Sequence, residues 1–197
     1  LWKTSDGRLG MFLGDATGHG IGPAMVVTQT RTLIRAMCDA RMAVSPRQVL
    51  ACANARLVQD LEAGQFVTAF VAFVSQDRAE WCSAGQGPIL FRARAGEDFQ
   101  IAAPSSPPLG IVADLNTDAP PPIPLEVGGM LCVVSDGIFE AFSPAGEEFG
   151  IRRIMQILNT AADPSQAIAH LQSAVQTWQG SEEPRDDQTI VIAARTG

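Results

Sequence analysis

The apolar segments of this chain are short, and they do not alternate regularly with helices. Several contain enough β-branched and aromatic residues to predict strands, at 9–13, 67–74, 80–84, 89–92, 130–134 and 189–194. Helices with apolar stripes are expected between them in pairs, at 23–41 and 46–61 and then at 151–158 and 164–178. Strands in runs with helices inserted as pairs favour an α+β fold of antiparallel sheets over a doubly wound parallel sheet.

The segment 102–124 is rich in proline and includes the stretches APSSPPLG and APPPIP. Because proline has no backbone N–H to donate to a ladder, this segment is predicted to be an irregular surface loop. Strand-like sequence resumes directly after it, which indicates a loop and not a linker between domains. Before it, the strands between 67 and 92 are expected to form an antiparallel meander. The 197 residues therefore predict a single domain over 1–197.

Composition excludes several classes of function. The net charge is −7, whereas a phosphate-backbone binder shows a basic stripe, so no nucleic-acid partner is expected. Lys3 is the only lysine, which argues against a P-loop lysine or a Schiff-base lysine within the fold. No Gly-x-Ser-x-Gly elbow is present to offer the nucleophilic serine of a Ser-His-Asp hydrolase. No apolar run reaches the roughly 20 residues that cross a bilayer. The widely spaced cysteines predict buried thiols in a reducing, cytoplasmic compartment; they are Cys38, Cys52, Cys82 and Cys132.

Aspartates occur at comparable places in three parts of the chain. Asp15 follows LGMFLG, Asp136 follows MLCVVS, and the pair Asp186–Asp187 precedes TIVIA. Each is next to a predicted strand, where a carboxylate either serves as a turn or helix-cap residue or joins others around a cation. Magnesium and manganese accept carboxylate, carbonyl and water oxygens, and such a site suits metal-assisted hydrolysis. Sequence spacing alone leaves both interpretations open.

The stretch LGDATGHGIGPAM closely resembles the Gly-Asp-x-x-Gly-His-Gly-x-x-Ala motif of bacterial PPM-type (type 2C-like) serine/threonine phosphatases of the SpoIIE and RsbU group. Further matches follow in the family's order, and they are FVTAFVAFV, AGQGPIL, SSPPLG, VVSDGIFEAFSPAGEEFG and RDDQTIVIAAR. Together they span residues 9–195. The resemblance implies a sandwich of two antiparallel β-sheets flanked by α-helices.

The resemblance also implies two Mn²⁺ or Mg²⁺ ions that activate a water for in-line attack on phosphorus. Carried onto this chain, Asp15 bridges both metals, the backbone carbonyl of Ala16 adds a ligand, and Asp136 and Asp186 bind from other strands. Three residues are expected to support these ligands. Asp187 orients the site, Gly137 gives room near the cation, and His19 either packs or bonds within the glycine loop or protonates the leaving oxygen.

By analogy with the family, the substrate is a phosphorylated regulatory protein of the anti-sigma-factor-antagonist type. A sensor or receiver domain is expected upstream. The helices at 23–41 and 46–61 resemble the pair that the family uses as a switch and for dimerisation; helices that simply cover the core explain the same periodicity, so the homodimer stays open.

Two features depart from the family pattern. The usual Gly-Gly-Asp strand is expected to be missing ahead of Leu1, and Gln86 stands where histidine is common. The alternatives are therefore a catalytically silent PPM-like interaction or dimerisation module, which the missing strand favours and the retained aspartates oppose, and a metal-dependent hydrolase of small phosphate esters.

Overall fold

The computed structural model describes residues 1–40, 44–115, 118–181 and 184–197. The chain divides into two units. Unit 1 consists of Leu1–Gln86 with Pro104–Ile123, and unit 2 consists of Gly87–Ala103 with Pro124–Gly197. Each unit has its own sheet, helices and apolar core.

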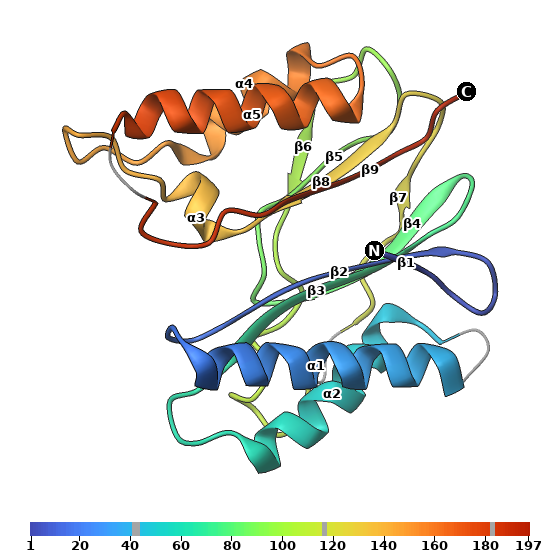
Figure 1. The fold of residues 1–197 in the computed structure, drawn as a ribbon. Helices are drawn as coiled ribbons and strands as arrows, with labels where there is room; N and C mark the ends of the chain where they lie inside the picture. The colour runs from blue at the N-terminus through green and yellow to red at the C-terminus, as the bar shows by residue number, and fades with distance from the viewer. Residues whose placement is uncertain (41–43, 116–117, 182–183) are drawn as a thin grey trace. The chain divides into compact units, whose positions relative to one another are not determined.

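Unit 1 is an antiparallel sheet with a pair of helices over one face (Figure 1). The strand order is β1-β2-β3-β4-β7. Its long central pair, β2 with β3, runs in register from Leu9 opposite Val74 to Ala16 opposite Val67. The elements are β1 (Trp2–Lys3), β2 (Leu9–Ala16), α1 (Ile21–Ala40), α2 (Pro46–Asp60), β3 (Val67–Val74), β4 (Arg78–Ala84) and β7 (Ile123–Pro124).

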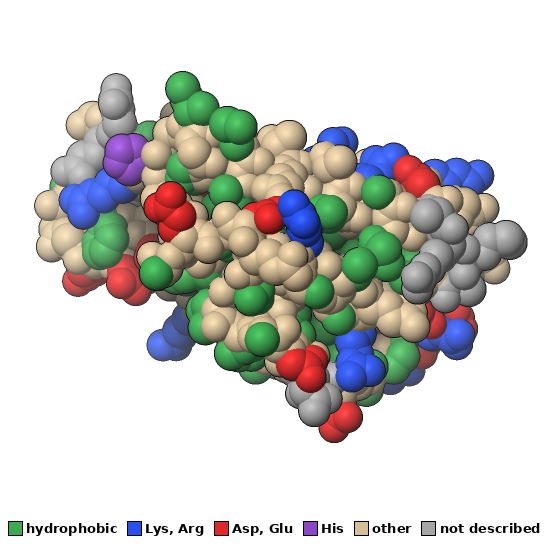
Figure 2. Space-filling model, turned by 90° about the horizontal axis from the view of Figure 1, so that it is seen from below, with side chains coloured by type: hydrophobic (Ala, Val, Ile, Leu, Met, Phe, Trp, Pro, Cys, Tyr) green, Lys and Arg blue, Asp and Glu red, His purple; other side chains and the backbone are tan. Residues whose placement is uncertain are grey.

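In unit 1, α2 begins as its sequence predicts, and both helices pack their apolar sides against the sheet. The Ser45 side chain accepts a hydrogen bond from the backbone N–H of Gln48, whose side chain accepts one from the Ser45 N–H, and proline follows at the first helical position. The apolar side of both helices buries residues such as Ile34, Leu50 and Leu57 against the sheet. Seen from the side of α1 and α2, other hydrophobic side chains lie singly or in small groups among polar ones (Figure 2), which is ordinary for a protein surface.

Unit 2 is a second antiparallel sheet, with strand order β6-β5-β8-β9. Helices α4 and α5 lie over one face of it, and the short helix α3 follows β8 directly (Figure 1). The Asp163 side chain caps α5 by accepting from the Gln166 N–H at 3.0 Å. The elements are β5 (Ile89–Arg92), β6 (Gln100–Ala102), β8 (Met130–Val134), α3 (Asp136–Phe139), α4 (Gly150–Thr160), α5 (Pro164–Gln179) and β9 (Ile190–Ala194).

The predicted fold class, two antiparallel sheets flanked by helices, is confirmed. The strands at 67–74, 89–92 and 130–134 match to the residue. The meander is wrong at its third strand, because β4 pairs with β3 while β5 pairs with β6 and β8. The first helix starts at Ile21, two residues before the prediction, and its predicted end, Arg41, lies outside the described residues.

Two further expectations need correction. The segment 102–124 is largely irregular, but it is not only a surface loop, because Leu109 and Leu115 are buried in the core of unit 1 and Leu109 bridges to Val67. All four cysteines, each within the described ranges, are free thiols, but Cys52 is exposed while the other three are buried. No helix in the described part of the chain is both long enough and apolar enough to cross a membrane.

Candidate metal-ligand residues and the pocket of unit 2

Asp15 is the second-last residue of β2, so it lies within the strand and not in the loop after it. Its register partner on β3 is Thr68. The Thr68 hydroxyl donates to the side-chain oxygen of Gln86 at 2.8 Å and lies 3.5 Å from the Asp15 carbonyl oxygen. Gln86, where the family commonly has histidine, is buried, and its backbone carbonyl accepts from the Ser83 hydroxyl. The strand pairing and this small network fix the backbone at Asp15.

The glycine loop after β2 is held to the start of β3 by one threonine. The Thr17 N–H donates to the Phe66 carbonyl at 3.1 Å, and the Thr17 hydroxyl accepts from the Phe66 N–H at 3.2 Å. Ala16, the proposed carbonyl ligand, closes β2 directly before it. His19 is exposed, and no hydrogen bond joins its side chain to another described residue. Its role in the loop or as an acid stays a prediction.

Asp136 is the first residue of α3, directly after β8. One of its carboxylate oxygens accepts from the Gly137 N–H at 2.9 Å. Its neighbour Ser135 is buried, and the Ser135 hydroxyl donates to the Asp187 carbonyl at 2.8 Å and accepts from the Thr189 N–H at 2.9 Å. This serine therefore ties the segment before β9 to the end of β8.

Gly137 is required by the close approach of that same segment. A Cβ at Gly137 would lie 2.4 Å from the Asp187 carbonyl oxygen and 3.1 Å from the Asp186 carbonyl oxygen. The room that the sequence predicts next to this glycine is thus occupied by backbone. As a result, Asp186 lies beside Asp136, and the Asp187 N–H donates to a carboxylate oxygen of Asp186 at 2.7 Å.

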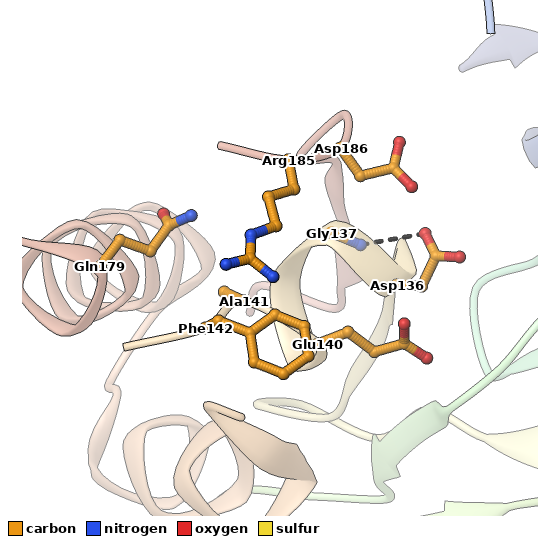
Figure 3. A pocket seen from close by; sticks show the side chains of 8 residues that line it. All are labelled: Asp136, Gly137, Glu140, Ala141, Phe142, Gln179, Arg185 and Asp186. Carbon is orange, nitrogen blue, oxygen red and sulfur yellow. Dashed lines mark hydrogen bonds between the residues drawn. The ribbon is translucent and has the colours of Figure 1, made fainter. Parts of the chain in front are cut away.

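Asp136 and Asp186 line one pocket of about 130 Å³ in unit 2. Their carboxylates point in the same direction, together with that of Glu140, while Arg185 points the other way (Figure 3). Burial raises the pKa of Glu140, and the negative charges of Asp136, Glu148 and Asp186 raise it further. The lining is Asp136, Gly137, Glu140, Ala141, Phe142, Gln179, Arg185 and Asp186.

The donor atoms of this pocket suit a hard divalent cation. Convergent carboxylate oxygens with little positive charge between them are the ligands that Mg²⁺ and Mn²⁺ prefer. Of the predicted residues, the structure brings Asp136, Gly137 and Asp186 together in unit 2, and Asp187 adjoins them through its backbone. Asp15, Ala16 and His19 belong to unit 1.

The sequence alone did not single out three residues that position or line the candidate sites of the two units. Ser135 and Glu140 belong to the quoted stretch VVSDGIFEAF, and Thr17 belongs to LGDATGHG. Their presence in those motifs was the available signal. Nothing in the local sequence indicated that Ser135 bonds to residues more than 50 positions away.

The family model described as Stage II sporulation protein E (SpoIIE) matches residues 5–196. The chain belongs to the SpoIIE family. The predicted resemblance to the SpoIIE and RsbU group of PPM-type phosphatase domains is therefore confirmed. No curated protein sequence matches the chain.

Solved structures of PP2C-type domains share the fold of this SpoIIE-family chain. The SiaA-PP2C domain of Pseudomonas aeruginosa has a TM-score of 0.78 at 22% identity, over 98% of this chain and 83% of that one. The RsbU and RsbW domains of Rv1364c from Mycobacterium tuberculosis give 0.76 at 22% identity, over 96% and 53%. The PP2C phosphatase domain with a regulatory-domain fragment of SpoIIE from Bacillus subtilis gives 0.70 at 17% identity, over 94% and 54%. The chain thus spans about half of each of the last two.

Proposed function

We propose that this chain is a metal-dependent phosphoserine/phosphothreonine protein phosphatase domain of a bacterial signalling pathway. The observation that carries the proposal is the pocket of unit 2, where the carboxylates of Asp136 and Asp186 point in the same direction (Figure 3). They belong to two of the three motifs from which the resemblance to this family implies metal ligands, and the third motif contains Asp15. Free thiols support a reducing, cytoplasmic setting.

Asp15, the carbonyl of Ala16, Asp136 and Asp186 would hold two Mn²⁺ or Mg²⁺ ions in the working enzyme. Bound there, the ions would supply an ionised water near neutral pH and offset charge on the phosphoryl oxygens. The chain's own residues prepare these ligands. Ser135 holds the backbone at Asp187, and the Asp187 N–H orients the Asp186 carboxylate at 2.7 Å.

The proposed substrate is a phosphorylated regulatory protein of the anti-sigma-factor-antagonist type. The support comes from relatives: one similar solved chain is described as RsbU and RsbW domains, and another includes a fragment of a regulatory domain. In the same way, we propose regulation by a sensor or receiver domain and dimerisation through α1 and α2. In that proposal, the sensor or receiver domain receives the input signal.

The test is hydrolysis of a phosphoserine peptide by the purified chain, with and without millimolar Mn²⁺. Asp136→Asn and Asp186→Asn are expected to lower turnover by about 10³-fold or more. Asp187→Asn should lower turnover by less than about tenfold, because asparagine keeps the backbone N–H that binds the Asp186 carboxylate. Asp77→Asn, at an exposed turn between β3 and β4, is the matched control and should leave turnover unchanged. Mn²⁺ affinity of each variant is measured by calorimetry.

Turnover that is independent of Mn²⁺, or that survives in Asp136→Asn, would contradict the proposal. Absence of both turnover and Mn²⁺ binding in the unmodified chain would favour the silent interaction module instead. Faster hydrolysis of a small phosphate ester than of any phosphopeptide would favour the small-molecule hydrolase.

A further inference from the structure

Arg185 lies directly before Asp186, but its side chain takes a different direction. The guanidinium extends into the 130 Å³ pocket of unit 2, between Phe142 and Gln179, while the carboxylates of Asp136 and Asp186 point away from it (Figure 3). In the described part of the chain Arg185 forms no ion pair. Its guanidinium therefore forms no direct salt bridge with Asp136 or Asp186.

Phe142 holds the guanidinium by its face. The Arg185 Cζ lies 4.9 Å from the centroid of the Phe142 ring. A cation–π contact of this kind uses the face of the guanidinium and leaves its N–H donors, which lie in the plane, available to an acceptor. Phe142 is itself half-buried and bridges to Glu148, so the contact rests on an ordered part of the unit.

Gln179 adds a second donor on the opposite wall of the pocket. It is 7% exposed, and its side-chain oxygen accepts from the Gln188 amide at 2.9 Å. With the oxygen engaged, the amide nitrogen lies on the side of Arg185 (Figure 3). Gln179 also lines a larger groove of about 720 Å³, together with Gln172, Gln176 and Gln188. The donor pocket thus adjoins a wide groove, and none of the described residues that line this groove is charged.

We infer that Arg185, supported by Phe142 and Gln179, binds an oxyanion of the phosphoprotein substrate beside the carboxylates of Asp136 and Asp186. This inference rests on the proposed function and names a substrate contact for it. Among the described residues that line the pocket, Arg185 is the only cation, and its planar guanidinium fits a phosphoryl or carboxylate group in bidentate fashion. The oxyanion is either a phosphoryl oxygen or the carboxylate of an acidic residue next to the phosphoserine.

The competing explanation is that Arg185 only balances the charge of the acidic pocket. The two explanations differ in what a substitution changes. Loss of a substrate contact weakens substrate binding and leaves Mn²⁺ affinity unchanged, whereas loss of charge balance alters Mn²⁺ affinity and the melting temperature. The matched control is Arg152→Gln, at an exposed arginine on α4 that lines none of the pockets described above.

The experiment compares the unmodified chain with Arg185→Gln, Arg185→Lys and Arg152→Gln, all with Mn²⁺. Binding of a labelled thiophosphoserine peptide is measured by fluorescence anisotropy, and KM and kcat are measured on p-nitrophenyl phosphate and on phosphopeptides with Glu or Gln beside the phosphoserine. Arg185→Gln should weaken peptide binding about tenfold, the loss expected for hydrogen bonds to a charged group. The peptide affinity of Arg185→Lys should lie between those of the unmodified chain and Arg185→Gln, since lysine keeps the positive charge but loses the bidentate guanidinium.

The substrates identify the oxyanion. A KM increase on every substrate indicates the phosphoryl group, and an increase only on the Glu peptide indicates the flanking carboxylate. The inference is overturned if Arg185→Gln binds peptide as Arg152→Gln does, if its Mn²⁺ affinity falls by the same factor as its peptide affinity, or if the unmodified chain binds no peptide. Peptide binding without turnover would refute the proposed function alone, and the Arg185→Gln binding ratio would still decide this inference.

Discussion

Unit 1 and unit 2 hold their proposed metal ligands by different means. In unit 1, Asp15 is part of a long strand whose whole length from Leu9 to Ala16 is paired with β3. The backbone ladder therefore sets the position of this aspartate, and many hydrogen bonds share the task. A change in any one neighbouring side chain leaves most of that support in place.

In unit 2, Asp136 begins a four-residue helix, and Asp186 lies in a segment that is neither helix nor strand. Their approach depends on the hydroxyl of Ser135 and on the missing Cβ of Gly137. A few local contacts therefore position the aspartates of unit 2, whereas a ladder of backbone hydrogen bonds positions Asp15 in unit 1. We therefore expect unit 2 to be the more sensitive of the two to conservative substitutions beside its aspartates.

Among substitutions beside the aspartates, the largest effect is expected from Gly137→Ala. The added methyl group would lie 2.4 Å from the Asp187 carbonyl oxygen, and a backbone atom cannot move aside as a side chain can. The segment at Asp186 should shift, with a cost of about 1–3 kcal/mol in the free energy of unfolding. A shift of about 1 Å beside the reacting groups predicts a loss of about 100-fold in turnover. Urea denaturation and phosphopeptide kinetics measure the two effects.

Gly14→Ala is the matched change in unit 1, directly before Asp15. Its methyl group would meet the Phe12 ring at 2.6 Å and the Thr68 carbonyl oxygen at 3.2 Å. The half-buried Phe12 side chain can rotate away, so turnover should fall by less than about tenfold. The contrast between the units is wrong if Gly14→Ala costs as much turnover as Gly137→Ala.

Ser135→Ala is expected to disturb unit 2 less than Gly137→Ala does. Ser135 is buried, with 7% of its surface exposed. The change removes its hydroxyl and leaves the Thr189 N–H without that acceptor. The expected cost is about 1–3 kcal/mol, with faster hydrogen exchange at the Thr189 amide. Mn²⁺ affinity should fall about 10–100-fold because the backbone beside Asp186 loses its support.

Thr17→Val in unit 1 is the counterpart of this change. It removes the acceptor of the Phe66 N–H but keeps the backbone bond from the Thr17 N–H to the Phe66 carbonyl. Both residues are half-buried, so water can replace the lost partner and the cost should stay at about 1 kcal/mol or less. An equal loss in the two variants would show that the ladder of unit 1 gives its ligand no extra protection.

Local sequence predicted the strands better than it predicted their partners. The runs VTAFVAFV and MLCVV became strands with the expected bounds, because their β-branched and apolar content is a local property. The partner of β5 was wrong, since pairing is chosen by contacts with β8, some 40 residues later in the chain. Proline content predicted the irregular backbone of 102–124, but not that Leu109 would fill the core of unit 1.

The candidate site divides in the same way. The motif aspartates could be named from the sequence, because residue type and order along the chain identify them. The role of Gly137 could not, because it depends on the backbone of Asp187 passing 2.4 Å from where its Cβ would be. Arg185 escaped notice because its aromatic partner, Phe142, lies more than 40 residues away in sequence.

The smallest expected effects concern two acids whose pKa values shift in opposite directions. In unit 1, hydrogen bonds from Arg8 and Thr4 lower the pKa of Asp6 from 3.8 to about 2. The ionised form is favoured on folding, so its stabilisation is present above pH 4 and is lost as the pH falls towards 2. Asp6→Asn should lower the free energy of unfolding at pH 7 by about 1 kcal/mol or less, and the difference should vanish below pH 2.

In unit 2, burial and the charges of Asp136, Glu148 and Asp186 raise the pKa of Glu140 above its ordinary 4.5. Folding therefore disfavours the ionised form, and this penalty is full above the raised pKa and absent well below 4.5. With a chelator present to remove divalent metal, Glu140→Gln should raise the melting temperature at pH 7 and leave it unchanged near pH 3. Thermal melting followed by circular dichroism at both pH values measures this. A lower melting temperature at pH 7 would mean that Glu140 stabilises unit 2 through its charge, as Asp6 does unit 1, and the two acidic regions would then follow one rule.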